Sequence, residues 1–161
     1  MRRNYQRNPY HLPAQGIHGD CFRTSLSCLL DLEPEDVPLF VDQDDDSWFE
    51  SLNRWLAARG LTYIAFEVAD ASQFAGLLAF GGRAVFHVMQ IRAPSGHEHA
   101  LVGLNGSPYW CPTLGDVQGR SFEVLNIGFL VHTSLNTGCY TKAHGPDALQ
   151  SHGEPDARKE V

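Results

Sequence analysis

The sequence predicts an α+β protein in which helices come first and an antiparallel sheet follows. Apolar residues repeat at helical spacing from Cys21 and again within residues 47–60. After Arg83, short apolar runs alternate with turn residues, which is the pattern of successive strands. Helices followed by consecutive strands are typical of the α+β class. The 161 residues, 43% of them hydrophobic, suffice for one core.

Each element follows from its local pattern. The helix from Cys21 has an apolar face of Phe22, Leu26, Leu29 and Leu30. The helix within 47–60 repeats this stripe and stops at Gly60, and a short third helix is expected in 70–82. The predicted strands are 61–68, 83–91, 99–104, 107–111 and 126–134. We expect an extended N-terminal segment in 1–14, one domain in 15–135 and a disordered tail in 136–161.

Charge and composition narrow the possible partners. The formal net charge of −7 argues against nucleic acid, because phosphate binding depends on clustered Lys and Arg. No apolar run is long enough for a membrane span, and none follows the basic start as in a signal peptide. Cys21 and Cys28 are seven residues apart on one predicted helix, too far to bridge, and no C-x-x-C pair occurs. We therefore expect a cytoplasmic protein with reduced thiols, whose oligomeric state the sequence does not predict.

The segment 15–32 carries the strongest chemical signal. Cys21 opens the first helix, where unpaired N–H groups favour the thiolate, the reactive form of cysteine. Gly16 and Gly19 let the backbone turn closely before the helix. Asp20 is expected to cap the helix by accepting a bond from a first-turn N–H. Cys21 is thus a candidate nucleophile that needs a base.

His99 is the best candidate base among eight histidines. It stands at the entry to the strand 99–104, directly after a turn at 94–96, so its ring can be held rigidly at a sheet edge. His87 lies within an apolar strand and is expected to be a core residue. His97 shares a strand face with His99 if the strand begins early.

These segments resemble the papain-like cysteine peptidase superfamily. Gln15 precedes the G-D-C-F segment 19–22, and a later histidine enters a strand. The segments also resemble small bacterial and phage proteins of that superfamily, which carry a G-D-C-F-R start and an H-A-V-V-like strand. The resemblance covers residues 15–133 as an order of elements. It implies a papain-like fold with the cysteine helix packed on a C-terminal antiparallel sheet. It also implies roles for Gln15 in the oxyanion hole, Cys21 as nucleophile and His99 as general base.

The residue that would orient His99 departs from the pattern that the resemblance implies. Papain-like enzymes carry Asn or Asp on the following strand, and the small relatives are expected to have Asp-Pro where this chain has Cys111-Pro112. A hairpin turn at 105–106 folds this pair back opposite His99 and its neighbour, provided that no bulge shifts the register. A thiol is a weak acceptor, so Asp116 and Asn105 are further candidates, and a dyad without a third member is also possible.

The residues together predict a cysteine-dependent hydrolase, either a peptidase or an amidase or isopeptidase. It would act on a peptide or protein through a Cys21–His99 thiolate–imidazolium pair and a thioester, with no cofactor or metal. Two alternatives stay open. A catalytically weakened papain-like protein would bind a protein partner, since Cys111 stands at the expected acid. A metal site would use His97, His99 and Cys111, with His-x-His on one strand and a third ligand across the hairpin.

Overall fold

The computed structural model describes residues 1–10, 12, 15–40, 47–69, 83–93 and 96–133. Its elements are α1 (Cys21–Leu30), the 3₁₀ turn η2 (Pro34–Asp36), α2 (Trp48–Ala57), β1 (Leu61–Glu67), β2 (Phe86–Arg92), β3 (Glu98–Leu104), β4 (Ser107–Cys111), β5 (Gly115–Asp116) and β6 (Glu123–His132). Two α-helices and a six-stranded antiparallel sheet confirm the predicted α+β class for this part of the chain. The expected helix in 70–82 and the expected tail in 136–161 lie outside the described residues.

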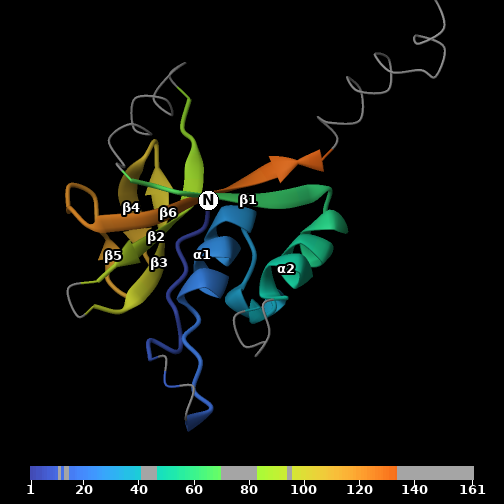
Figure 1. Cartoon of the computed structure of the whole chain (residues 1–161), viewed down its shortest axis with the longest axis horizontal. Helices are drawn as coiled ribbons and strands as arrows, with labels where there is room; N and C mark the ends of the chain where they lie inside the picture. Colours follow the sequence, from blue (N-terminus) through green and yellow to red (C-terminus); the bar gives the residue numbers. More distant parts are fainter. Residues whose placement is uncertain (11, 13–14, 41–46, 70–82, 94–95, 134–161) are drawn as a thin grey trace, which may run out of the picture.

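The sheet has the strand order β1-β6-β2-β3-β4-β5, and every neighbouring pair is antiparallel (Figure 1). Helix α1 packs on β3 and β2, and α2 packs on β1. The helix-side core contains Leu26, Val37, Phe40, Leu52, Leu56, Tyr63, Val88 and Ala100. Successive residues of a strand point to opposite faces, so Leu101 leaves this core and joins a second cluster. That second cluster consists of Met89, Ile91, Leu101, Cys111 and Val117.

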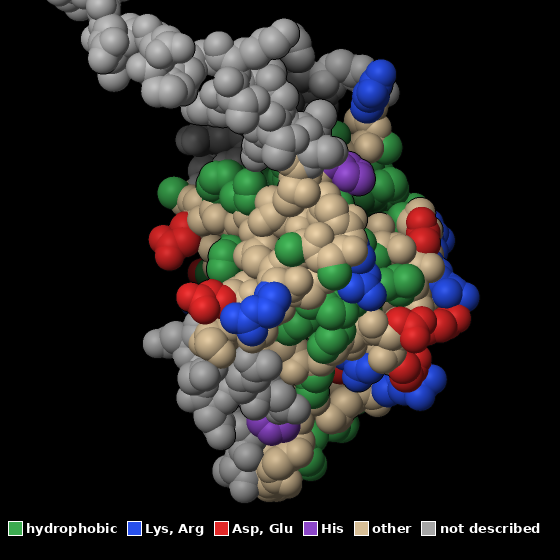
Figure 2. All heavy atoms as spheres, turned by 90° about the vertical axis from the view of Figure 1, so that its right-hand side faces the viewer, with side chains coloured by type: hydrophobic (Ala, Val, Ile, Leu, Met, Phe, Trp, Pro, Cys, Tyr) green, Lys and Arg blue, Asp and Glu red, His purple; other side chains and the backbone are tan. Residues whose placement is uncertain are grey.

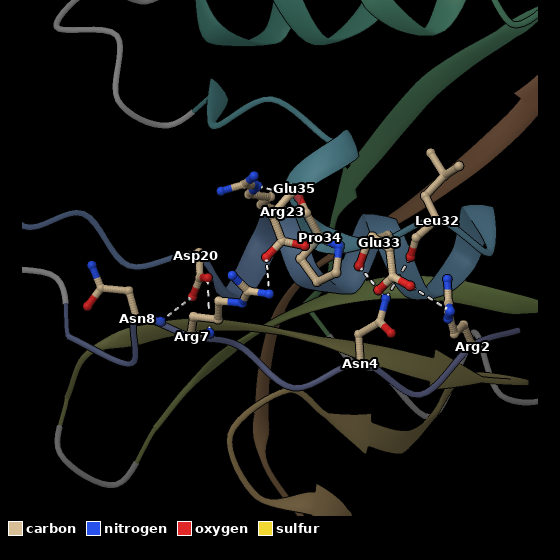
Figure 3. A network of polar contacts seen from close by, with 11 residues as sticks. Arg2, Asn4, Arg7, Asn8, Asp20, Arg23, Leu32, Glu33, Pro34 and Glu35 are labelled. Carbon is tan, nitrogen blue, oxygen red and sulfur yellow. Dashed lines mark hydrogen bonds and ion pairs between the residues drawn. The ribbon is translucent and has the colours of Figure 1, made fainter.

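Residues 1–8, which we call the N-terminal strap, contain no helix or strand, as expected, but hydrogen bonds hold them to the body of the protein. The Asn4 side chain donates to Ser27 and Leu32 at the end of α1, and the Trp110 indole N–H donates to the Asn4 carbonyl. Two ion pairs, Arg2–Glu33 and Arg7–Glu35, join the strap to the segment around η2 (Figure 3). The strap therefore connects α1 to β4.

The surface combines charges of both signs with apolar groups. On the face shown in Figure 2, acidic and basic side chains lie among hydrophobic ones. None of the helices in the described ranges has the length and apolar character needed to cross a bilayer.

Candidate active site around Cys21 and His99

Cys21 is the first residue of α1, as the sequence predicted. Asp20 occupies the N-cap position, but the prediction that its side chain caps the helix was wrong. Its carboxylate, 6% exposed, accepts the backbone N–H of Arg7 at Oδ2 and of Asn8 at Oδ1, both at 3.1 Å (Figure 3). The Asp20 backbone (φ −106°, ψ 20°) lies outside the extended conformation that directs a side chain towards the first turn. Asp20 therefore fixes the strap beside Cys21.

The Cys21 thiol is half-buried against the helix-side core. Burial raises the pKa of this thiol and is the largest influence on it. The backbone amides of Ala100, Phe22 and Cys21 itself favour the thiolate and lower its pKa, whereas the charge of Asp20 adds to the rise. Because the net effect is a raised pKa, the thiol is protonated at neutral pH, and nucleophilic attack requires a base.

His99 is the second residue of β3 and is half-buried. Burial lowers the pKa of its imidazole, which favours the neutral ring. Its Nε2 atom lies 3.3 Å from the Cys111 Sγ atom and 3.5 Å from the Thr113 hydroxyl oxygen. The described residues include no hydrogen bond between Cys21 and His99. The backbone amide of Ala100, the residue after His99, favours the Cys21 thiolate. The His99 side chain itself shares the face of β3 with Leu101, opposite the helix-side core against which Cys21 packs.

A β-bulge between β3 and β4 decides which residues lie behind His99. Beside the hairpin turn Gly103 pairs with Pro108, but after the bulge Val102 pairs with Trp110. Continuing that register places Thr113 opposite His99, one position further than an unbulged hairpin predicts. Directly opposed residues share a sheet face, so the bulge brings Thr113 to the imidazole.

Cys111 lies on the face of β4 that joins the second apolar cluster, and it is 2% exposed. Within the described part of the chain, Cys21, Cys28 and Cys111 form no disulfide.

Gln15 is exposed, in the turn that follows Leu12. Its backbone N–H donates to the Leu12 carbonyl at 2.8 Å, and Gly16 beside it has the positive φ (67°) that the glycine was expected to provide. Within the described ranges, the Gln15 side chain makes no hydrogen bond to Cys21. The structure thus places Gln15 in the loop before α1 without bringing its amide to the thiol.

The two other candidates for orienting His99 are bound elsewhere. The Asp116 carboxylate accepts the backbone N–H of Gln118 at 3.0 Å and its side-chain amide, and these bonds lower the pKa of Asp116. Asn105 lies in the turn at the far end of β3, where its Oδ1 accepts the Val85 N–H at 2.8 Å. Both side chains therefore stabilise turns and strand ends.

His97 precedes β3 and is exposed. In the parts of the chain that the structure describes, no three His, Cys, Asp or Glu side chains are grouped so as to hold a metal ion. His97, His99 and Cys111 all belong to those parts. The tripod of ligands considered from the sequence is thus not formed. His87, in contrast, is fully buried, which confirms its expected place in the core.

Sequence reasoning missed two residues of the site, Thr113 and Gln6. The Thr113 hydroxyl donates to the Gln6 side-chain oxygen at 2.8 Å, and the Gln6 backbone N–H donates to the Pro112 carbonyl at 3.0 Å. Thr113 could have been found from its spacing, because it stands two residues after Cys111 and residues at that spacing share a strand face. Gln6 has no such signal, since the strap follows no period.

The fold is α+β, with a thiol at the start of the helix that packs on β3 and an imidazole on the opposite face of that strand, near its first residue. No protein family, curated protein or solved structure matches the chain.

Proposed function

We propose that the protein is a papain-like, cysteine-dependent hydrolase that cleaves amide bonds in peptides or proteins. Cys21 is the nucleophile and His99 is the general base. The observation that supports the proposal is the packing of α1, whose first residue is Cys21, on β3, whose second residue is His99. Nucleophilic catalysis by cysteine requires a thiol and a base within reach of it, so the proposal requires the His99 ring to turn past the end of β3 towards Cys21 when substrate binds.

The resting pair is neutral in this proposal. Burial raises the pKa of Cys21 and lowers that of His99, and both shifts disfavour the thiolate–imidazolium pair expected from the sequence. His99 therefore accepts the thiol proton as the sulfur attacks. A base with a pKa near or below neutrality is deprotonated and ready at neutral pH.

The reaction proceeds through a thioester. The sulfur of Cys21 bonds to the carbonyl carbon, its proton moves to His99, and the carbonyl π electrons move to the oxygen. When this intermediate collapses, the C–N bond breaks and the departing amine takes the proton from His99. Water then attacks the thioester while giving a proton to His99. The Cys21 sulfur leaves and recovers that proton, and a carboxylic acid is released.

The oxyanion needs hydrogen-bond donors near the start of α1. The Cys21 backbone N–H is one donor, because first-turn N–H groups have no partner within a helix. The Gln15 side-chain amide is the second donor, and it must turn towards Cys21 when substrate binds, since it is exposed in the free protein. Loss of one such donor typically costs about 2.7–4 kcal/mol of transition-state stabilisation.

One observation supports a second candidate, a weakened enzyme that binds a protein partner. The ring nitrogen Nε2 of His99 contacts the Cys111 thiol, where papain-like enzymes have an Asn or Asp. A thiol is a weaker partner for an imidazole than an amide or carboxylate oxygen is.

Alkylation by iodoacetamide, followed by peptide mass mapping from pH 5 to 9, tests the site. We expect Cys21 to react faster than the fully buried Cys28, which is an internal control thiol. His99→Gln should slow alkylation of Cys21 about tenfold at neutral pH. It should have little effect at high pH, where the thiol ionises without a base. Alkylation of Cys21 that does not depend on His99 at any pH would contradict the proposal.

Acylation separates the active enzyme from the weakened one. With p-nitrophenyl acetate, the enzyme should give an acetyl group on Cys21, detected by mass spectrometry, and continued release of p-nitrophenol. Cys21→Ser should abolish both signals, whereas Cys111→Ser should retain them. Acetylation without turnover would favour the weakened protein.

A further inference from the structure

A chain of three hydrogen bonds runs from the N-terminal strap to His99. The Gln6 side-chain N–H donates to the Asn8 carbonyl at 3.2 Å, and the Gln6 side-chain oxygen accepts the Thr113 hydroxyl at 2.8 Å. The Thr113 oxygen then lies 3.5 Å from the Nε2 atom of His99.

The direction of proton donation along this chain follows from its first member. A carbonyl can only accept, so the bond to Asn8 fixes which end of the Gln6 amide is nitrogen, and the Gln6 oxygen faces Thr113. That oxygen also carries no proton, so the Thr113 hydroxyl proton is committed to Gln6. The Thr113 oxygen can therefore only accept from His99.

The acceptor at Thr113 selects one tautomer of the imidazole. With the proton on Nε2, the ring donates to the Thr113 oxygen, and the Cys111 sulfur at 3.3 Å accepts a second, weaker branch of the same bond. With the proton on Nδ1, the lone pairs of Nε2 and of the Thr113 oxygen would face each other, and only the weak S–H donor of Cys111 would offset that repulsion. The favoured tautomer leaves Nδ1 as the bare nitrogen that can accept a proton.

We propose that Thr113 and Gln6 are positioning residues for His99, and that they take the place of the Asn or Asp that orients the histidine in papain-like enzymes. This inference rests on the proposed function for its catalytic meaning. Thr113 holds the proton of His99 on Nε2, and Gln6 keeps Thr113 as an acceptor. Neither residue touches the reacting atoms.

The strap gives Gln6 a fixed place. Its backbone N–H donates to the Pro112 carbonyl, directly between Cys111 and Thr113. The following two residues are held through their backbone N–H groups by the buried carboxylate of Asp20. Gln6 is thus held in place by one hydrogen bond to the hairpin, at Pro112, and by two hydrogen bonds from the next two residues to Asp20 before α1.

Nitrogen-15 NMR of the full chain with labelled histidine tests the tautomer without any assumption about catalysis. Protonated and bare ring nitrogens have separate chemical shifts, so the spectrum of neutral His99 shows which nitrogen carries the proton. We expect Nε2–H in the wild type and a mixture of tautomers in Thr113→Val. Thr113→Ser, which keeps the hydroxyl, should restore the wild-type spectrum. Thr113 is exposed, so its variants are expected to fold.

Gln6 is tested through the same signal. Gln6→Met removes the acceptor at similar length and should also give a mixture, because the Thr113 proton is then free to point at His99. Gln6→Glu keeps an acceptor oxygen and should retain Nε2–H. An unchanged Nε2–H tautomer in both Thr113→Val and Gln6→Met would overturn the inference.

Alkylation of Cys21 at neutral pH then separates the two proposals. If both stand, Thr113→Val slows the reaction several-fold, and adding Gln6→Met to it causes no further loss, since Gln6 acts only through Thr113. Asp116→Asn is the matched control and should leave the rate unchanged. If the tautomer responds to these variants but the rate ignores His99→Gln, the proposed function fails while Thr113 and Gln6 remain the partners of His99.

Discussion

Asp20→Asn should destabilise the N-terminal strap. The Asp20 carboxylate is 6% exposed, and each of its oxygens accepts one backbone N–H of the strap at 3.1 Å. Asparagine retains one acceptor oxygen and presents an NH₂ group to the other N–H. One charge-assisted bond is therefore lost, and a poorly solvated donor is left facing a second donor. Charge-assisted bonds contribute roughly 1.5–3 kcal/mol each, so we expect a loss of about 2–3 kcal/mol.

Two measurements on the full chain check this value. Urea unfolding followed by tryptophan fluorescence detects release of the strap, because the Trp110 indole N–H donates to the carbonyl oxygen of Asn4 in the strap. Native-state hydrogen exchange at the amides of Arg7 and Asn8 reports local detachment. At about 1.4 kcal/mol per tenfold change, we expect their exchange to accelerate about 30- to 150-fold. Glu67→Gln removes the same charge from an exposed carboxylate on β1 and should change neither measurement.

An Asp20→Asn variant that keeps both the urea midpoint and the protection of the two amides would contradict this role of the carboxylate. Such a result would mean that the strap stays in place without the carboxylate. Loss of protection at Arg7 and Asn8 with an unchanged midpoint would instead show that the strap detaches locally before global unfolding, which agrees with the proposed role of Asp20.

Three further predictions concern the core. Burial lowers the pKa of His87, so the unfolded chain binds more protons, and stability should fall as the pH drops below about 6.5. In acid unfolding His87→Phe should weaken this loss, and an undiminished loss in that variant would contradict the assignment. Gly128→Ala should cost about 1–3 kcal/mol in urea unfolding, because the new Cβ overlaps the Tyr63 ring and hydroxyl; an unchanged midpoint would contradict this packing. Asn53→Ala should cost about 2 kcal/mol in the same assay, since its Oδ1 accepts the Tyr63 backbone N–H at 2.7 Å; wild-type stability would argue against that bond.

The regular elements were predictable because burial is periodic in them. The apolar stripe from Cys21 marked α1, and the run 107–111 coincides with β4. Strand β6 begins at Glu123, earlier than the predicted 126, because its first residues carry no alternating apolar pattern. Strand β5, two residues long, is too short for any period to mark it. The sequence thus predicted the elements whose packing repeats along the chain.

The site was predictable only in part, because single long-range contacts complete it. The thiol and the imidazole were recognised from residue type and local position. Cys111 was among the residues considered from the sequence as partners of His99, and it lies 3.3 Å from the ring. Thr113 was not considered, because the β-bulge shifts the register by one residue and brings it opposite His99. The strap was missed for a similar reason. It is held by side-chain and backbone bonds to Asp20 and Pro112, and neither contact leaves a pattern in the sequence.

The burial of Cys111 explains why a neutral partner suits His99. Cys111 lies in a cluster with Met89, Ile91, Leu101 and Val117. A carboxylate there would lose most of its solvation, and it would raise the pKa of the imidazole by favouring the charged ring. A thiol costs little in this cluster and leaves His99 neutral, and the hydroxyl of Thr113 and the amide of Gln6 add no charge. In the proposed enzyme, charge therefore develops at the imidazole only as Cys21 attacks. The specificity for substrate would then depend on how well a bound carbonyl reaches the N-terminus of α1.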